Sequence, residues 1–474
     1  MTSLMTSSTP TPRDSIVTAL SSRPLAVDLF AGVGGLSLGL ELAGFFVASF
    51  VEIDDTASRY HEYNFPGSVG FCGTKQGNVR GVTGEDILSR LPHRDVTLVA
   101  GGPPCQGFSF AGKKNPNDPL NDLVLEMARI VLEIRPKAFL IENVPGIKSG
   151  QIWQLDEAMR RLSMEYTVSE PTTLYAPDYG VPQNRKRVFV MGIRRDLERL
   201  PKMPAPTHQR EGRKQRGQML IEAKVAPTVR DALDDLPDVD LFESLINGDE
   251  VQYTGDPRSE YQQLMHGSNL ARSRGYHVAW DDTLVTNSRR TRHGDDLSAR
   301  LGALLPSKSD PVSGIKRLHP DELSVTIRAG TTSERGSWSA PRPCHYRFAR
   351  VLTTRECARL QSFPDWFRFH PVKWHGNRQV GNAVPPLLAK AVGEGVLSSL
   401  GIPPAQEAAS IPTYVRDSEL IAADIQGAVE SGLDQRHITH QVVGTRQRPE
   451  GEPRRGRAKK QETLYASGAL GFPA

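Results

Sequence analysis

The sequence predicts an α/β fold: a Rossmann-like, doubly wound and mostly parallel sheet, joined to a second, smaller domain. Two observations predict the sheet. Between residues 25 and 195, short apolar segments alternate with helical ones, which is the pattern of a parallel sheet. The first apolar segment runs into a glycine-rich turn before a helix, as in nucleotide-binding units. Beyond residue 200, proline, arginine and acidic clusters replace this alternation, so a different domain is expected there.

The apolar segments predict the elements in order. Strands are expected at 25–30, 46–51, 96–100, 138–141 and 188–193. Helices are expected at 120–132 and 154–162, and again at 354–360 and 386–400. Residues 1–24 are rich in Ser, Thr and Pro and are expected to form a mobile tail.

Composition excludes several classes of protein. The 474 residues contain no run of ~18 apolar residues, so no membrane-spanning helix is expected, and the N-terminus lacks the pattern of a secretion signal. The four cysteines form no CxxC pair, which argues against a disulfide framework and a zinc site, so no metal is expected. These features together predict a cytoplasmic protein.

The net charge of +4 is unevenly distributed. Residues 446–460 hold seven basic and two acidic side chains, whereas residues 231–260 hold ten acidic side chains and one arginine. We expect the basic tail to be disordered and to attract phosphates without specificity. The acidic stretch is expected to face away from any polyanion.

The glycine-rich segment from Ala26 to Gly39, AVDLFAGVGGLSLG, has the layout of a cofactor-binding turn. Its glycines let the backbone approach a ligand closely. About 20 residues later, Glu52 ends the next strand with a carboxylate that can accept hydrogen bonds from ribose hydroxyls. The two features predict a nucleoside cofactor, and a tight turn without a ligand is the alternative.

Three further segments place reactive side chains at strand ends. Cys105 follows a strand in a Gly- and Pro-rich loop that would not bury it, which favours a nucleophile over a small core residue. Glu142 ends an apolar strand, where burial can raise the pKa of a carboxyl so that it donates a proton near neutrality. A helix cap or an ion pair is the alternative for Glu142. Arg185 and Arg187 are expected to point to the same face and to contact a polar substrate, and solvated charges are the alternative.

Six blocks of this chain, in this order, resemble those of the DNA (cytosine-5)-methyltransferases, which are class I methyltransferases that use S-adenosylmethionine. The blocks are DLFAGVGGLSLGL, GGPPCQGFS, ENVPG, QNRKRVFV, LTTRECARLQSFP and RQVGNAVPP. The absence of additional domains resembles the prokaryotic type. The resemblance implies a catalytic region at 25–200, a target-recognition domain at 201–345, a C-terminal return at 346–400 and an extension at 401–474. Residues 201–345 are called the recognition region below.

The resemblance also implies the chemistry. Cys105 would add as a thiolate to C6 of a cytosine flipped out of duplex DNA. Glu142 would hold and protonate N3, and C5 would then take the methyl group. Arg187 would contact O2, with Arg185 beside it. Loss of the C5 proton would release Cys105 and leave 5-methylcytosine.

The residues that would bind S-adenosylmethionine follow in the same way. They are Phe30, Ala31, Gly32, Gly34, Gly35, Leu36, Glu52, Ile53, Leu123, Asn382, Ala383 and Val384. Asn78 is a departure, because the family usually has an aspartate there that accepts a bond from the adenine amino group. The amide oxygen of Asn78 can accept the same bond, so binding is expected to survive.

The choice of DNA sequence is expected to reside in the recognition region. Its segment from Leu323 to Gly330 resembles a short block often found there. Five arginines are candidates for DNA contacts, although a solvated surface is the alternative for each: Arg289, Arg290, Arg292, Arg328 and Arg335.

Double-stranded DNA is the expected substrate, and the expected context is a monomer that modifies the target site of a restriction endonuclease. A solitary DNA methylase is one alternative. Methylation of cytosine in RNA is another, although the Cys-Phe-Thr signature of that branch is absent. A binding module without activity would need a damaged Cys105 or Glu142, and both residues are present.

Overall fold

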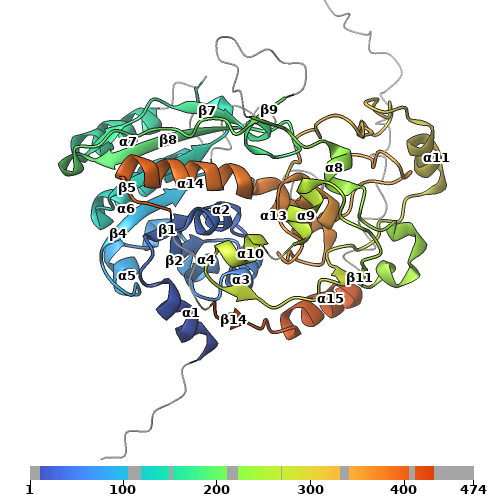
Figure 1. Cartoon of the computed structure of the whole chain (residues 1–474), viewed down its shortest axis with the longest axis horizontal. Helices are drawn as coiled ribbons and strands as arrows, with labels where there is room; N and C mark the ends of the chain where they lie inside the picture. The colour runs from blue at the N-terminus through green and yellow to red at the C-terminus, as the bar shows by residue number, and fades with distance from the viewer. Residues whose placement is uncertain are drawn as a thin grey trace, which may run out of the picture. The chain divides into compact units, whose positions relative to one another are not determined.

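A sheet of eight strands organises the first 200 residues of the computed structural model (Figure 1). The structure describes residues 11–104, 119–148, 153–210, 223–267, 269–330, 341–404 and 411–431. The strands are β1 (Leu25–Leu29), β2 (Phe46–Glu52), β3 (Val69–Cys72), β4 (Val96–Gly101), β5 (Ala138–Asn143), β6 (Tyr166–Val168), β7 (Thr172–Tyr175) and β8 (Lys186–Arg194). Their order is β3-β2-β1-β4-β5-β8-β6, with β7 paired to β8. The first five strands are parallel neighbours, and β8 is antiparallel to β5, β6 and β7.

The expected fold class is therefore confirmed, and each of the five expected strands is present. The strands β3, β6 and β7 were not expected. Each has only three or four residues, which is too short for an apolar pattern to stand out from its surroundings.

Helices cover both faces of the sheet. Ala26 and Leu98 share a core with α2 (Gly35–Ala43) and α14 (Pro386–Leu400) on one face. Val27 and Val99 pack with α6 (Leu123–Ile134) on the other face, with α5 (Gly84–Leu88) and α7 (Trp153–Glu165) beside it. The central strands are mostly apolar because both faces of the sheet are buried. The helix expected at 386–400 is present as α14, which lies within the predicted C-terminal return 346–400 and packs along α2.

The N-terminal segment is not wholly the tail that its composition predicts. Helix α1 (Pro12–Leu20) begins with a capping box, in which the side chains of Thr11 and Asp14 bond each other's backbone amides. Ile16 and Leu20 are buried, in a cluster that includes Phe46 of β2. Two apolar residues four apart on a short polar helix suffice to anchor it, although such a pattern is too brief to predict with.

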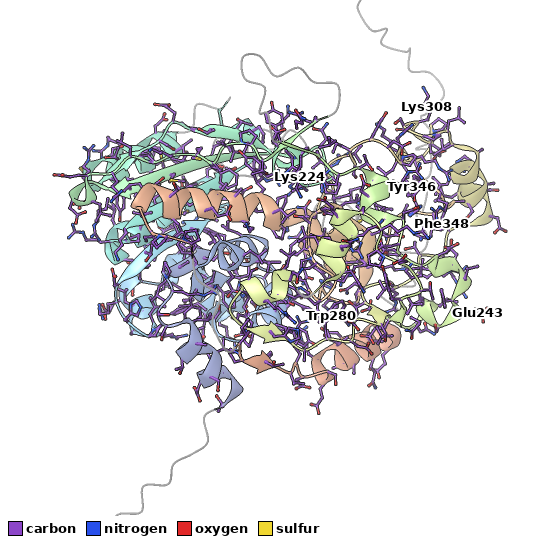
Figure 2. The ribbon with its side chains drawn as sticks, viewed as in Figure 1. Lys224, Glu243, Trp280, Lys308, Tyr346 and Phe348 are labelled. Carbon is purple, nitrogen blue, oxygen red and sulfur yellow. The ribbon has the colours of Figure 1, made fainter. Side chains whose placement is uncertain are left out.

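The recognition region consists mostly of short elements. They are β9 (His208–Gln209), β10 (Lys224–Val225), α8 (Val229–Leu233), β11 (Val251–Gln252), α9 (Glu260–His266), α10 (Asn269–Ser273), β12 (His277–Val278), β13 (Leu284–Val285) and α11 (Asp295–Ala303). Tyr346 and Phe348 lie among these elements, whereas Glu243 and Lys308 lie near the outer margin, away from the sheet (Figure 2).

Buried side chains of this region do not form a core of their own. Val229, Met265 and Ile327 share one cluster with Leu38 of α2 and with Tyr60 of α3 (Asp55–Asn64). Arg274, fully buried, also pairs with Glu41 of α2 at 2.6 Å. The separate domain expected at 201–345 is therefore continuous in its packing with the catalytic region, and residues 1–438 cluster as one compact unit.

Three helices and a strand complete the described chain: α12 (Thr354–Leu360), α13 (Lys373–Asn382), β14 (Thr413–Tyr414) and α15 (Glu419–Ser431). β14 pairs in parallel with β12, and Asp424 of α15 bonds Arg59 (3.1 Å) and Tyr60 (3.0 Å) of α3. The first part of the predicted extension is thus folded against the rest of the protein. Among the described helices, none is long and apolar enough to span a membrane.

Candidate active site

The predicted site residues come from loops at the carboxyl ends of the parallel strands. Glu52 is the last residue of β2, and Glu142 is next to last in β5. Gly32 follows β1, and Gly102 follows β4. Because parallel strands end at one edge of a sheet, four separate segments of the chain meet there.

Glu52 ties the glycine-rich loop to the second strand. One carboxylate oxygen accepts the amide of Gly32 (2.7 Å), and the other accepts the amide of Asp54 (2.8 Å). Burial raises the pKa of Glu52, and these amides oppose the shift by favouring the charged form. The carboxylate therefore stands beside the loop backbone, where a ribose would need it.

The glycines of this loop differ in what surrounds them. Gly32 has a φ of +57°, and a Cβ built there would meet nothing within 4 Å. A Cβ at Gly34, whose φ is +99°, would lie 2.3 Å from the ring of Phe65. At Gly35 it would lie 2.5 Å from the carbonyl oxygen of Val384. The open space next to Gly32 can admit a ligand, whereas Gly34 and Gly35 make room for protein.

The other predicted cofactor residues divide by exposure. Ile53 is 50% exposed, as a surface for an adenine ring would be, and Asn382 is also exposed. Ala31, Leu36, Leu123 and Val384 are buried, while Phe30 and Ala383 are partly buried. Phe30 also has a φ of +59°, which is unusual for a residue with a side chain.

Asn78 lies close to the end of β2. A Cβ at its neighbour Gly77 would lie 1.9 Å from the carbonyl oxygen of Glu52. The side-chain oxygen of Asn78 accepts the amide of Arg80 at 3.2 Å, and the side chain is exposed. The amide is therefore at the rim of the space that Glu52 and Ile53 border.

On the other side of the edge, Glu142 and Arg187 form an ion pair at 2.5 Å, with both side chains 11% exposed. A Cβ at Gly102 would lie 2.8 Å from a carboxylate oxygen of Glu142, so this glycine admits the carboxylate. Burial raises the pKa of Glu142, and the charges of Arg187 and Arg185 lower it. A buried carboxyl and a guanidinium are thus held together beside Gly102, on the segment that leads to Cys105.

Cys105 itself lies outside the described residues. The chain leading to it is fixed, because the side-chain amide of Asn143 donates to the carbonyl of Pro103 at 3.1 Å. Asn143 thereby joins the end of β5 to the loop after β4.

Arg185 does not use its side chain as the sequence suggests. It is 1% exposed and donates to the carbonyls of Ile327, Gly381 and Ala383, each at 2.9 Å. These bonds engage both terminal nitrogens of the guanidinium, while its Nε has no hydrogen-bond partner among the described residues. Arg185 lies just before the first residue of β8. Its side chain therefore does not follow the alternation of a strand, which would have placed it on the same face as Arg187. It joins the recognition region to the segment predicted to close the cofactor site.

Sequence reasoning missed a polar network under the glycine-rich loop. Asp28 accepts a bond from Ser37 of α2 (2.6 Å), whose hydroxyl is 2.9 Å from a ring nitrogen of His61. Burial raises the pKa of Asp28 to about 7, with further contributions from the charges of Glu52 and Glu142. A carboxylate in the middle of the apolar strand AVDLF was the signal that could have found this network.

The predicted DNA-contacting arginines separate clearly. Arg289 is 3% exposed, so its side chain lies in the interior rather than on the surface. Arg290 pairs with Asp240 at 3.2 Å. Arg292 and Arg328 are exposed, and Arg335 lies outside the described residues.

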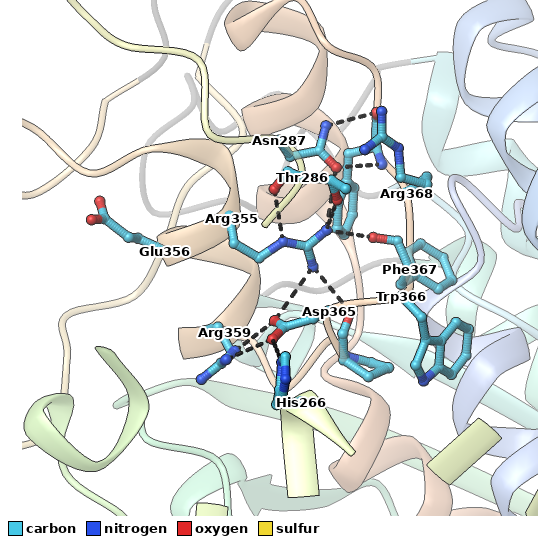
Figure 3. Close-up of polar contacts among 12 residues, drawn as sticks. His266, Thr286, Asn287, Arg355, Glu356, Arg359, Asp365, Trp366, Phe367 and Arg368 are labelled. Atoms are coloured by element: carbon cyan, nitrogen blue, oxygen red, sulfur yellow. Dashed lines mark hydrogen bonds and ion pairs between the residues drawn. The ribbon is translucent and has the colours of Figure 1, made fainter. Parts of the chain in front are cut away.

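The acidic stretch 231–260, which we expected to face away from DNA, supplies several carboxylates to ion pairs within the protein. Its carboxylates pair with arginines from 347–368: Asp234 with Arg347, Asp235 with Arg359, and Asp249 and Glu250 with Arg368. Figure 3 shows the centre of this network, where Arg359 faces Asp365 and Arg355 donates to the backbone around it. Buried charges require such partners, so the paired carboxylates hold the segment around α12 (Thr354–Leu360) in place.

The chain is similar to known proteins over most of its length. The family model described as C-5 cytosine-specific DNA methylase matches residues 26–398. The chain is 38% identical over 452 residues to the Type II methyltransferase M.XorII of Xanthomonas oryzae pv. oryzae, which covers 94% of this chain and 100% of that protein. It is 32% identical to the Type II methyltransferase M.AgeI of Thalassovita gelatinovora, covering 78% and 98%.

A solved structure is also similar. It is a prophage-encoded E. coli protein assigned as a DNA modification methyltransferase, with 31% identity and a TM-score of 0.63. The similarity covers 80% of this chain and 99% of that one.

Proposed function

Because this chain belongs to the C-5 cytosine-specific DNA methylases and is a DNA (cytosine-5)-methyltransferase, we propose that Cys105 is its nucleophile and that Glu142 and Arg187 hold the target cytosine. The observation that carries the proposal is the buried pair of Glu142 and Arg187 beside Gly102, three residues before Cys105. A carboxyl and a guanidinium so placed match the N3 and O2 atoms of cytosine, which accept hydrogen bonds.

The protein's part in the reaction is to change the electron distribution of the ring. The Cys105 thiolate forms a bond to C6, and the electron pair of the C5–C6 double bond shifts toward C4 and N3 of the ring. Glu142 gives its proton to N3, which neutralises the charge that develops there. Once C5 has taken the methyl group, its proton passes to a base such as water or hydroxide, the bond between C6 and the sulfur breaks with release of the thiolate, and N3 returns its proton to Glu142, so that the aromatic ring is restored. The target base must leave the helix for any of these contacts.

The cofactor proposed is S-adenosylmethionine, which supplies an electrophilic methyl group when bound. The described residues fit its nucleoside: Glu52 lies beside the open space at Gly32, and the exposed Ile53 offers an apolar surface to a ring. Asn78 would accept from the adenine amino group. Asn382, Ala383 and Val384 would close the pocket, held in place by Arg185.

Trapping tests the nucleophile. A fluorine at C5 cannot leave as a proton does, so duplex DNA with 5-fluorocytosine at the target should remain bonded to Cys105. We expect a denaturant-resistant adduct with the wild-type protein and S-adenosylmethionine, and none with Cys105→Ala. Equal trapping by both proteins would refute the assignment.

We also propose that the protein protects the site of a restriction endonuclease, since the relatives above are named Type II methyltransferases. Double-stranded DNA is the proposed substrate, in the cytoplasm, with a monomer as the active form. Bisulfite sequencing of DNA from cells that express the protein gives the site and the cytosine. A solitary methylase would methylate a site that no endonuclease of the host cuts, and an RNA methyltransferase would leave the DNA unmodified.

The recognition region is proposed to choose that site, with Arg292 as a candidate for base contacts. Arg292 is exposed, and its neighbour Arg290 is held by Asp240. Loss of a bidentate arginine–guanine contact costs ~1–3 kcal/mol. Arg292→Ala should therefore relax one position of the site by roughly 10- to 100-fold while cofactor binding stays unchanged.

A further inference from the structure

The segment from Ser324 to Ala329 of the recognition region packs on residues that flank the candidate active site. The amide of Asn184 donates to the carbonyl of Ser324 at 2.8 Å. The amide of Ile327 donates to the side-chain oxygen of Gln183 at 3.1 Å, and Thr326 donates its hydroxyl to the carbonyl of Asn184 at 2.7 Å. These bonds dock the segment on the residues immediately before Arg185.

The opposite side of the same segment is held by the residues that precede Asn382. Arg185 bridges the two, because it donates both to the carbonyl of Ile327 and to that of Gly381. A Cβ at Gly381 would lie 2.4 Å from the amide nitrogen of Ala329, so the two backbones are in contact there. The backbone of residue 328 therefore has a fixed position between the substrate side and the cofactor side of the site.

The side chain of Arg328 points away from this packing. Ile327 is buried, at 1% exposure, whereas Arg328 is exposed. Among the described residues, no hydrogen bond or ion pair engages its guanidinium, in contrast to Arg290, which has Asp240. A free cation on a fixed backbone is suited to bind an anion, because less of its freedom remains to be lost on binding.

We propose that Arg328 binds a DNA phosphate next to the cytosine that Cys105 attacks, and so holds the target strand while the base is outside the helix. This inference rests on the proposed function. In the proposed function, Arg187 and Glu142 hold the target base. The guanidinium of Arg185, whose charge acts on Glu142, donates to the carbonyl oxygen of Ile327 at 2.9 Å. It thereby links this part of the site to residue 328. The anion that must lie just outside a flipped base is the phosphate that links it to its neighbour. A guanidinium can bind two phosphate oxygens at once.

A phosphate is favoured over a base edge for a geometric reason. The backbone that carries Arg328 is packed against the catalytic region. A side chain that recognises base pairs must instead extend into a groove of the DNA. Contact with a phosphate gives no sequence preference. Arg328 is thus a positioning residue for the target strand, and Arg292 remains the candidate for reading the sequence.

The experiment uses the full-length protein and a duplex containing the site found by bisulfite sequencing. Arg328→Ala should weaken DNA binding ~10-fold at 0.1 M salt and reduce the slope of log affinity against log salt by about 1. The methylated sequence, the affinity for S-adenosylmethionine and the melting temperature should not change. Arg258→Ala is the matched control, since Arg258 is an exposed arginine within the acidic stretch and should leave both binding and slope unchanged.

A phosphate scan identifies the partner. Phosphates flanking the target cytosine are replaced one at a time by uncharged methylphosphonates. One replacement should cost the wild type ~10-fold in affinity and cost Arg328→Ala almost nothing, because the interaction is already lost. Arg328→Lys should recover part of the loss through its charge.

If the loss of affinity from Arg328→Ala and the loss from a methylphosphonate add up at every phosphate, the inference is wrong. It is also wrong if the Arg328→Ala protein methylates a different sequence. Normal binding by Arg328→Ala, with Cys105 trapped on 5-fluorocytosine as expected, would overturn this inference alone. Failure of the wild type to form the adduct would overturn the proposed function and this inference with it.

Discussion

Glu142→Gln tests whether the buried carboxyl acts in the chemical step. Glutamine keeps the length and shape of the side chain and can still form a hydrogen bond. It cannot transfer a proton to N3 of the cytosine. The contact with Arg187 at 2.5 Å would become a bond between an amide and a cation.

Two effects of different size follow from the structure. Loss of a general acid typically costs ~10²-fold or more in rate, which corresponds to about 2.7 kcal/mol. Breaking a buried ion pair leaves the guanidinium of Arg187 without a counter-charge and can lower the free energy of unfolding by ~3–5 kcal/mol. The rate must therefore be measured where the variant is still folded.

The assay is a single-turnover methylation of duplex DNA, with enzyme and S-adenosylmethionine in excess. We expect the rate constant to fall ~100-fold, while the dissociation constant for S-adenosylmethionine, whose proposed contacts are with Glu52 rather than Glu142, changes little. Because Glu142 must carry the proton, the wild-type rate should fall as the pH rises through its pKa, which burial raises. That limb of the pH profile should be absent from the variant. Glu85→Gln is the control, because the pair of Glu85 and Arg94 is exposed.

An unchanged rate constant would remove Glu142 from the chemical step. A loss of rate that matches the unfolded fraction, measured by circular dichroism in the same buffer, would assign the residue a purely structural part. Only a loss in the folded protein, with cofactor affinity kept, supports the proposed role.

Three other predictions concern the fold and the tail. Burial raises the pKa of Asp28 to about 7, so the free energy of unfolding of the wild type should fall as the pH rises from about 4 to 7, because the unfolded chain gives up this proton more readily. Over the same pH range, the free energy of unfolding of Asp28→Asn, measured in urea titrations, should rise by up to about 4 kcal/mol relative to the wild type, and a difference that stays constant with pH would contradict this. Gly35→Ala should lower stability by ~1–3 kcal/mol, because its Cβ would meet the carbonyl of Val384, and an unchanged melting temperature would show that α14 can move aside. Truncation after Gly444 removes the basic run and should make DNA binding less salt-dependent without changing the methylated site, which bisulfite sequencing checks.

Local patterns determined most of the fold. The five expected strands and the helices at 354–360 and 386–400 are present because each is long enough for its apolar residues to show the period of the element. The position of Glu52 and Glu142 at strand ends was equally predictable, since the carboxyl edge of a parallel sheet is set by the order of strands and turns. The family resemblance added the roles of these residues, which no local pattern contains.

The partners of charged and small residues were decided by the tertiary structure. Arg185 and Arg187 look alike in the sequence, but one holds three backbone carbonyls and the other pairs with Glu142. Gly32 and Gly35 stand in one motif, but only Gly32 faces open space.

The acidic stretch 231–260 shows why the partners of charged residues depend on the tertiary structure. Its net negative charge is evident in the sequence, but the arginines that neutralise it lie 113 to 124 residues away, in and around α12. Which elements form, and where their reactive ends lie, can be predicted from the sequence because both depend on neighbours along the chain. Which charges are buried, and against what, depends on segments that only the folded chain brings together, because the cost of burying a charge is met by whichever partner the packing supplies.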